Sequence, residues 1–230
     1  LVYNKLPLTL NAKHRLKYFL LRHFYFVFSR LSLVELQQKN IKTHLRDEIS
    51  KQYQRLNDDY QQAQPLPKNT DAVPKVTIII PFLGCIKETA LCLYSIYRDE
   101  YDFSFEIILI DNNSDEDASD LEQRFPGVQI IRNTSNLGFG IACNQAAALA
   151  KAKLLLFLNN DVVLLPGAIN ALVETVEYDE NVGAVGAKLI YPDGRLQEAG
   201  GLVCASGDTV NIGRYADPES YTYNFIRRVD

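Results

Sequence analysis

The sequence predicts an α/β fold with a mainly parallel sheet, preceded by an α-helical extension. Two observations lead to this prediction. From residue 76 onward, short apolar runs alternate with longer helical stretches, whereas the preceding residues are richer in charge and show no such alternation. Strands that alternate with helices form right-handed βαβ units, which build a doubly wound, Rossmann-like sheet. With 230 residues, 47% of them hydrophobic, the chain is long enough for one globular domain plus an extension.

The extension is predicted to comprise residues 1–64, and its first half is basic and aromatic. Residues 1–30 contain Lys and Arg but no Asp or Glu, although the whole chain has a net charge of −4. Residues 11–31 combine this charge with Phe and Tyr, as helices in a membrane interface do. Packing on this protein or on a neighbouring domain is the alternative, and both interpretations stay open. The apolar stretch is interrupted by Arg22 and His23 and is too short to span a bilayer.

An amphipathic helix is predicted for the second half of the extension. Its apolar residues recur at steps of three and four, with charged and amide side chains between them: Ile41, Leu45, Ile49, Tyr53, Leu56 and Tyr60. Residues 65–75 are rich in proline and are predicted to be a linker. The third predicted segment is the domain of residues 76–230.

The ends of the chain and its cysteines give two further expectations. The sequence begins at Leu1 and contains no methionine, so we expect it to be part of a longer polypeptide. Its four cysteines are scattered, without a Cys-x-x-Cys pair, which favours reduced thiols over a zinc site or a disulfide framework.

Four continuous apolar runs are the predicted strands of the sheet. They comprise residues 76–80, 105–110, 128–132 and 153–158, and such runs are typical of strands that are covered on both faces. The stretches between them are long enough for crossover helices. In sheets of this kind, ligands bind beyond the carboxyl ends of the strands.

Polar residues follow each predicted strand at that edge. The first strand continues into Pro81 and Phe82, the second into residues 111–114 (DNNS), the third into 133–138 (NTSNLG), and the fourth into 159–161 (NND). Asp and Asn are common in turns, so any one of these groups alone is weak evidence for a site. Four such groups at one edge favour a binding site.

The chemistry of these residues indicates what the site could bind. A carboxylate accepts hydrogen bonds, so Asp111 could receive an imide N–H from a pyrimidine base. Mg²⁺ and Mn²⁺ prefer oxygen ligands and are often held by one or two carboxylates together with phosphate oxygens, which suits Asp161. All three histidines lie in the extension, so a histidine-dependent triad in this domain is excluded. The GxxxxGK[ST] phosphate loop is absent.

Five sequence blocks in this order resemble family 2 glycosyltransferases of the GT-A fold. They are VTIIIPFLG, FEIILIDNNSDED, NTSNLGFGIACNQA, LLLFLNNDVVLLPGAI and VGAVGAKLIYPDGRLQEAG, and they cover residues 76 to about 203. The resemblance is strongest to bacterial rhamnosyltransferase-like enzymes of surface polysaccharide assembly. It implies a nucleotide-sugar-binding sandwich and a nucleotide-sugar donor, such as a dTDP- or UDP-sugar.

The resemblance also assigns roles to individual residues. It implies a divalent cation, Mn²⁺ or Mg²⁺, on Asp161 with Asn159 nearby, because the family's Asp-x-Asp motif matches residues 159–161. It implies base recognition by Asp111. The nucleotide pocket would then include Pro81, Phe82, Asp111, Asn113, Ser114, Asn136, Gly138, Asn144 and Asn160, with Phe139 beside it.

The sequence departs from the family pattern at three positions. Gly84 stands where many relatives have Asn, and Cys143 replaces a common Arg. Asn159 in place of Asp removes one negative charge from the metal site, which should lower metal affinity unless phosphate oxygens dominate the coordination.

The resemblance implies transfer with inversion to a hydroxyl of a glycan or lipid-linked acceptor. Such a transfer needs a general base, which the family places after the donor-binding half. We expect the base beyond Asp230 in the parent polypeptide, so this chain should bind donor with little or no turnover. The expected location is the cytoplasm, at the inner face of the bacterial inner membrane, and no nucleic-acid partner is expected.

Two other functions stay open at this point. One is a noncatalytic nucleotide-binding or scaffold module. The other is a sugar nucleotidyltransferase, although the glycine-rich loop after the first strand that is typical of that class is absent.

Overall fold

The computed structural model describes residues 32–66 and 73–226, which divide into two compact units. One unit contains the described residues between 53 and 185, and the other contains residues 32–52 and 186–226. Residues 11–31, the basic segment for which membrane contact is one of two open interpretations, lie outside the described residues. Within the described part of the chain, no helix is both long and apolar enough to cross a bilayer.

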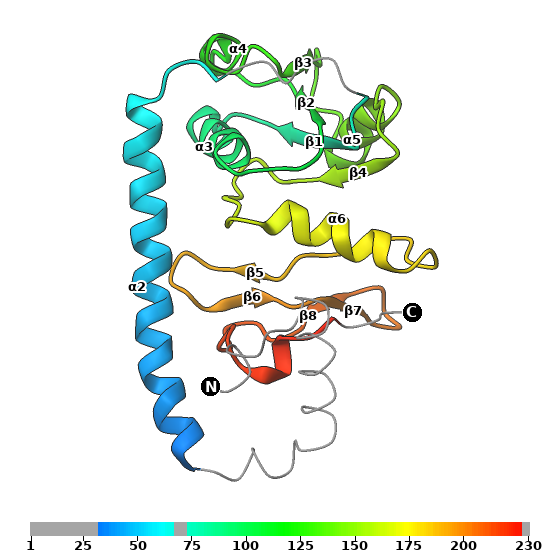
Figure 1. The fold of residues 1–230 in the computed structure, drawn as a ribbon. Coiled ribbons are helices and arrows are strands. Elements are labelled where there is room, and N and C mark those ends of the chain that lie inside the picture. The colour runs from blue at the N-terminus through cyan, green and yellow to red at the C-terminus, as the bar shows by residue number, and fades with distance from the viewer. Residues whose placement is uncertain (1–31, 67–72, 227–230) are drawn as a thin grey trace. The chain divides into compact units, whose positions relative to one another are not determined.

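A four-stranded parallel sheet forms the centre of the first unit (Figure 1). Its strands are β1 (Val76–Phe82), β2 (Phe105–Asp111), β3 (Gln129–Arg132) and β4 (Leu154–Phe157), in the order β3-β2-β1-β4. All three pairings are parallel, with Val76 opposite Phe105 and Leu154, and Asp111 opposite Arg132. The predicted α/β class and parallel sheet are therefore confirmed.

Three helices connect successive strands of the sheet, and a fourth helix follows the last strand. They are α3 (Ile86–Tyr97), α4 (Ser119–Arg124), α5 (Phe139–Ala147) and α6 (Ala168–Tyr178). Side chains alternate between the two faces of each strand. The expected cover on both faces is wrong for the edge strand β4, whose Leu155 and Phe157 are exposed. One face carries Ile78 and Ile80 into a large core with residues of α3, α4 and α6, and the other carries Ile79 into a smaller core with Ala142 and Ala146 of α5.

Pro81 shows how the sheet opens at its carboxyl edge. The N–H of Leu158, after β4, donates to the carbonyl of Ile79, and the N–H of Asn112, after β2, donates to the carbonyl of Phe82. Successive residues of β1 thus bond in turn to the β4 side and to the β2 side. By this alternation Pro81 faces the β4 side, two residues beyond the point where Ile79 pairs with Phe157. The missing N–H of proline costs no ladder bond there.

Helix α2 (Ser32–Gln62) is the amphipathic helix that the apolar spacing predicted. Its last turns belong to the first unit, where Leu56 and Tyr60 are buried in or beside the main core. Tyr60 lies 5.7 Å from the ring of Tyr94, and its hydroxyl donates to Asp120 at 3.3 Å. The expected boundaries of the linker, at residues 64 and 75, remain predictions. Leu56 and Tyr60 lie before the first of them but are buried in the unit that contains the parallel sheet.

The second unit contains short antiparallel pairs. Strand β5 (Leu189–Ile190) pairs with β6 (Leu196–Glu198), β7 (Gly201–Val203) pairs with β8 (Thr209–Asn211), and a 3₁₀ turn, η2, follows at Tyr221–Tyr223. Its fully buried centre is Leu196, whose side chain lies close to Gly213. Gly213 has a φ of +78°, and a side chain there would also meet Tyr223, so glycine is required.

Candidate nucleotide and metal site

Most of the predicted site residues lie at the carboxyl edge of the sheet. Asp111 ends β2, residues 159–161 follow β4, and Phe82 ends β1 (Figure 1). Asn136 and Gly138 lie between β3 and α5, and Gly138 precedes the first turn of α5. Since all four strands are parallel, these segments leave the sheet at the same edge.

Asp111 is held in place by its own turn. Asp111 is only 5% exposed, and its Oδ1 accepts the N–H of Ser114 at 2.8 Å. The turn passes through Asn113, which is exposed and has a φ of +74°, a conformation that Asn tolerates better than most residues. Arg132 lies opposite on β3, with its Nε 3.9 Å from Oδ2 of Asp111. One oxygen of Asp111 thus accepts a backbone hydrogen bond, while the other faces the half-exposed guanidinium of Arg132.

A network of side-chain amides joins the ends of β2 and β3. The Oδ1 of Asn112 accepts the Nδ2 of Asn133 at 3.1 Å and the N–H of Leu137 at 3.0 Å, and its Nδ2 donates to Asn136 at 2.7 Å. Asn133 also exchanges two hydrogen bonds with Gln145 of α5. The residues that make this network were not among the predicted site residues, apart from Asn136.

The loop after β1 contributes mainly backbone groups. Pro81 and Phe82, which were expected to follow the first strand, are instead the last two residues of β1. Both are buried, and Phe82 belongs to the main core. The N–H of Gly84 donates to the hydroxyl of Ser114 at 2.7 Å, which joins the β1 and β2 loops. The N–H of Cys85 donates to Glu116 at 2.9 Å, so the carboxylate of Glu116 lies at the start of α3. Glu116 is a second contact that sequence reasoning missed.

Two predicted residues are placed by α5. Gly138 has a φ of +79°, and its N–H donates to the Oδ1 of Asn136 at 2.9 Å, so this turn orients the helix start toward the amide network. Asn144 lies further along α5 and is exposed. Cys143, beside it, is buried, and burial raises the pKa of its thiol. Cys143 therefore supplies no charge to this part of the edge.

Residues 159–161 leave β4 in a turn that exposes two oxygen-bearing side chains. The N–H of Val162 donates to the carbonyl of Asn159 at 3.4 Å, which closes the turn. Asn159 and Asp161 are exposed, whereas Asn160 is half-buried and donates from Nδ2 to Thr89 Oγ1 at 3.0 Å. The predicted pocket residue Asn160 therefore points part of its side chain toward α3.

The buried thiol of Cys92 lies beneath this turn. Its Sγ donates to the carbonyl of Asn159 at 3.6 Å. Burial, with a smaller contribution from the negative charge of Asp161, raises the pKa of Cys92 to about 12. The thiol is therefore neutral at physiological pH and acts as a donor to the turn.

The donor set at this turn fits Mg²⁺ or Mn²⁺. Asp161 supplies an exposed carboxylate and Asn159 an exposed amide oxygen, which are oxygen ligands of the kind these cations prefer. No cluster of three or more His, Cys, Asp or Glu that could hold a metal occurs among the described residues. A cation here would consequently take most of its ligands from water and from a bound diphosphate.

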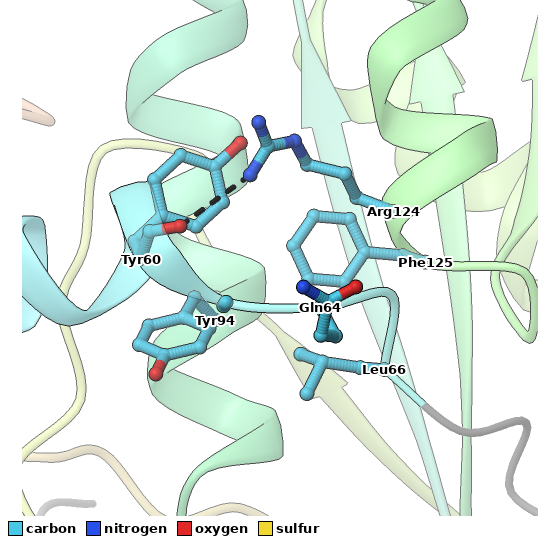
Figure 2. Close-up of a pocket in the computed structure, with 7 residues that line it drawn as sticks. Tyr60, Gln64, Leu66, Tyr94, Arg124 and Phe125 are labelled. Carbon is cyan, nitrogen blue, oxygen red and sulfur yellow. Dashed lines mark hydrogen bonds between the residues drawn. The ribbon is translucent and has the colours of Figure 1, made fainter.

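A small pocket lies elsewhere, where the end of α2 meets α3 and α4 (Figure 2). Arg124 donates to the carbonyl of Tyr60 at 3.4 Å and lies 4.8 Å from the centre of its ring. The remaining lining residues are mainly apolar or aromatic, and include Leu66, Tyr94 and Phe125. This pocket is a packing contact of the helical extension and is separate from the carboxyl edge of the sheet.

Comparison with known proteins decides the family. Residues 77–217 match the family described as glycosyl transferase family 2, and this range is more than half of the chain. The chain belongs to glycosyl transferase family 2. The family resemblance noted in the sequence is thereby confirmed.

Sequence relatives of this family 2 chain are much longer than it is. O-antigen biosynthesis protein RfbC of Myxococcus xanthus is 35% identical over 138 residues, which cover 58% of this chain and 11% of RfbC. Protein y4gI of Sinorhizobium fredii is 30% identical over 163 residues, which cover 68% of this chain and 18% of y4gI. The chain thus spans less than a fifth of either relative.

Two solved structures overlap with parts of this family 2 chain. Staphylococcus aureus TarS 1–349 has a TM-score of 0.41 and 17% identity, with 50% of this chain and 39% of TarS covered. Mannosyltransferase PcManGT from Pyrobaculum calidifontis, in complex with GDP-Man and Mn²⁺, has a TM-score of 0.44 and 17% identity. That overlap covers 67% of this chain and 48% of PcManGT. The family assignment rests on the sequence match.

Proposed function

We propose that this chain is the donor-binding part of an enzyme that transfers a sugar from a nucleotide-sugar to an acceptor hydroxyl with inversion. Family membership supports sugar transfer as the reaction class. The observation that carries the proposal further is the placement of Asp111 and of residues 159–161 at one edge of the sheet, after β2 and β4. Strand β1 lies between these strands, so the two groups are separated by about 10 Å at a strand spacing near 4.8 Å. A nucleoside and its diphosphate can bridge such a separation.

Each end of the proposed site has a distinct task. Asp111 accepts a hydrogen bond from the base, for which a pyrimidine imide N–H is the proposed donor. Asp161 and Asn159 hold Mn²⁺ or Mg²⁺, which when bound neutralises negative charge on the diphosphate leaving group. Through such a cation, the exposed amide and carboxylate at this turn would hold the diphosphate at the end of β4.

No general base is assigned within this chain. The acids Glu198 and Asp208 lie in the unit of residues 186–226, and nothing in their contacts marks either as a base: Asp208, for example, accepts a hydrogen bond from Ser206 at 2.7 Å. We therefore propose donor binding with little or no turnover for residues 1–230. The base is proposed to lie in the part of the parent polypeptide that follows Asp230.

We also propose a role in bacterial surface polysaccharide synthesis. The name of RfbC, which is 35% identical over the matched region, refers to O-antigen biosynthesis. The acceptor would be a glycan or a lipid-linked glycan, and the proposed location is the inner face of the inner membrane.

Isothermal titration calorimetry of the full chain with UDP and dTDP tests the donor site. We expect Mn²⁺ to strengthen the affinity for one nucleotide at least tenfold, because a cation held by Asp161 would offset the negative charge of the diphosphate. Asp161→Ala should abolish this gain without changing the melting temperature, since Asp161 is exposed. Asp102→Ala, an exposed aspartate before β2 at the opposite edge of the sheet, is the matched control and should keep the gain.

The same titration tests the proposed base contact. Asp111→Asn keeps the shape of the side chain but removes its charge, so nucleotide affinity should fall about tenfold both with and without Mn²⁺. Absence of heat with both nucleotides would contradict the proposed function. A gain from Mn²⁺ that survives Asp161→Ala would contradict the metal role alone.

A further inference from the structure

Helix α3 carries three small polar side chains at equal spacing, and all three are buried. Thr89, Cys92 and Ser95 follow each other at intervals of three residues, so they lie near one face of the helix. Their exposures are 0%, 0% and 1%. Buried polar groups are costly unless they have hydrogen-bond partners, so the partners of these three residues indicate why they are there.

All three contact the segment that connects β4 to α6. Thr89 Oγ1 accepts the side-chain amide of Asn160, and Cys92 Sγ donates to the carbonyl of Asn159. Ser95 Oγ accepts the N–H of Leu164 at 3.0 Å. We refer to Thr89, Cys92 and Ser95 together as the α3 polar row.

The hydroxyls of the row are also fixed from the helix side. Thr89 Oγ1 donates to the carbonyl of Cys85 at 2.9 Å, and Ser95 Oγ donates to that of Cys92 at 2.7 Å. Ser and Thr commonly make such bonds within helices. Here they leave the oxygen lone pairs directed at the connecting segment, because each hydroxyl hydrogen is already used.

Two further contacts continue the same attachment beyond the helix. Asp99 Oδ2 accepts the N–H of Gly167 at 2.8 Å, and Asn170 Nδ2 donates to the carbonyl of Glu100 at 2.9 Å. The connection from β4 to the first turn of α6 is thus bonded to α3 and the residues after it at successive points. It contains no regular secondary structure of its own between Phe157 and Ala168.

We propose that the α3 polar row positions Asn159 and Asp161 for the cation and diphosphate, so that Thr89 and Cys92 are positioning residues of the donor site. This inference rests on the proposed function. Leu158 and Val162, on either side of the turn, pack in or against the main core. Within the turn, the closing bond from Val162 is long at 3.4 Å, and the row contacts Asn159 and Asn160 directly. Loss of a row contact lets the turn move away from the geometry that a cation with a single protein carboxylate requires.

Thr89→Val is the main test, because valine has the same shape but lacks the oxygen that holds Asn160. We expect the Mn²⁺-dependent gain in nucleotide affinity to fall three- to tenfold, while affinity without Mn²⁺ changes less than twofold. Thr89→Ser keeps the oxygen and should therefore retain the Mn²⁺-dependent gain. Thr175→Val is the matched control: Thr175 makes the same type of bond, to the carbonyl of Ala171 in α6, and should leave the gain unchanged.

A second pair of variants keeps the test decisive if Thr89→Val fails to fold. Cys92→Ala removes the donor to Asn159 and should reduce the Mn²⁺-dependent gain, whereas Cys92→Ser retains a donor and should preserve more of it. Amide hydrogen exchange at residues 159–164 provides a readout independent of nucleotide, and we expect faster exchange in Thr89→Val and Cys92→Ala.

The outcomes separate this inference from the proposed function. If the unsubstituted chain shows no gain from Mn²⁺, the proposed function fails and the positioning role fails with it. If the gain is present and is lost in Asp161→Ala but is unchanged in Thr89→Val and Cys92→Ala, the row has only a structural role and the inference is overturned. Equal losses of affinity with and without Mn²⁺ would overturn it as well.

Discussion

At the carboxyl ends of β2 and β3 the polar side chains bond mainly to one another, whereas after β4 they face solvent. Asn112 is 6% exposed and bonds to Asn133, Asn136 and the backbone of Leu137. Asn159 and Asp161 are exposed, and the contacts that restrain their turn come from α3. The first half of the edge is thus built before a ligand arrives, while the second half keeps its oxygen atoms available to one.

This difference matches the tasks proposed for the two halves. Recognition of a base depends on fixed donors and acceptors, so a satisfied buried network is suited to it. Coordination of a cation needs free carboxylate and amide oxygens, and it tolerates neighbouring water and phosphate. The comparison implies that substitutions in the amide network act mainly on stability and those after β4 mainly on ligand affinity.

Asn112→Ala should produce the largest effect on stability. It removes three hydrogen bonds and leaves the N–H of Leu137 without its partner, while Asn133 keeps its bonds to Gln145 and Asn136 keeps the N–H of Gly138. We expect a loss of about 3 kcal/mol in the free energy of unfolding, because unsatisfied buried groups cost about 1–3 kcal/mol each and some will find water. Urea denaturation measures this loss.

Asn113→Gly is the control for that prediction. Asn113 is exposed and has a positive φ that glycine adopts without strain, so stability should change by less than about 0.5 kcal/mol. If Asn112→Ala were as mild as Asn113→Gly, the amide network would not be the feature that preforms this half of the edge.

The sequence predicted the strands and the edge correctly because these depend on local patterns. Residues 107–110 are apolar throughout, and β2 extends beyond this run to Asp111. The amide network depends instead on register: Asp111 pairs with Arg132, which brings Asn112 next to Asn133, 21 residues away in sequence. A local sequence pattern does not show which residues lie opposite each other on neighbouring strands. Asn112, the second polar residue directly after a buried strand, was nevertheless a usable signal for the network.

The α3 polar row was missed for a different reason. Within residues 88–100 the row looks like ordinary small residues of an amphipathic helix, and its meaning depends on partners about 70 residues later. The role of Leu56 and Tyr60 in the main core was also not evident, because helical spacing shows which face is apolar but not what that face packs against.

Asn159→Asp should sharpen the contrast from the β4 side. It adds a second carboxylate at an exposed position, which should raise Mn²⁺ affinity about fivefold, or about 1 kcal/mol, because carboxylate charge increases affinity for hard cations. The melting temperature should change little without metal. Titration of Mn²⁺ with and without UDP measures the effect.

The outcome of Asn159→Asp can also contradict the metal site. If added carboxylate charge leaves Mn²⁺ affinity unchanged while Asp161→Ala reduces it, Asn159 does not face the cation. Asn160→Asp is a useful companion, since the side chain of Asn160 donates to Thr89 and its replacement should weaken the turn rather than strengthen metal binding.

Tyr97 provides a pH-dependent test of α3, the helix that supports the β4 half. Its ring packs 5.8 Å from the rings of Phe105 and Phe125, and burial raises the pKa of its hydroxyl to about 12 from an ordinary value of 10.0. The unfolded chain therefore loses this proton first as the pH rises. The stabilisation is fully present below pH 10.0 and is lost as the pH approaches 12.

Tyr97→Phe should remove this part of the pH dependence. Between about pH 9 and pH 11 we expect the free energy of unfolding of the unsubstituted chain to fall by about 1 kcal/mol more than that of Tyr97→Phe. Urea denaturation at several pH values measures the difference. Parallel decreases in both proteins would mean that the Tyr97 hydroxyl reaches solvent and that α3 is less firmly packed than its contacts suggest.

The smallest effect is expected at Arg132, which borders the β2–β3 half without belonging to its amide network. Its side chain is 49% exposed and bonds to the exposed Glu122 at 2.9 Å, with Asp111 further away at 3.9 Å. Exposed ion pairs contribute little because water and salt screen them, so Arg132→Gln should change stability by less than about 0.5 kcal/mol. A loss above about 1 kcal/mol would mean that Arg132, and not only the N–H of Ser114, fixes Asp111. Nucleotide affinity should then also become strongly dependent on salt, which titrations at low and high ionic strength would reveal.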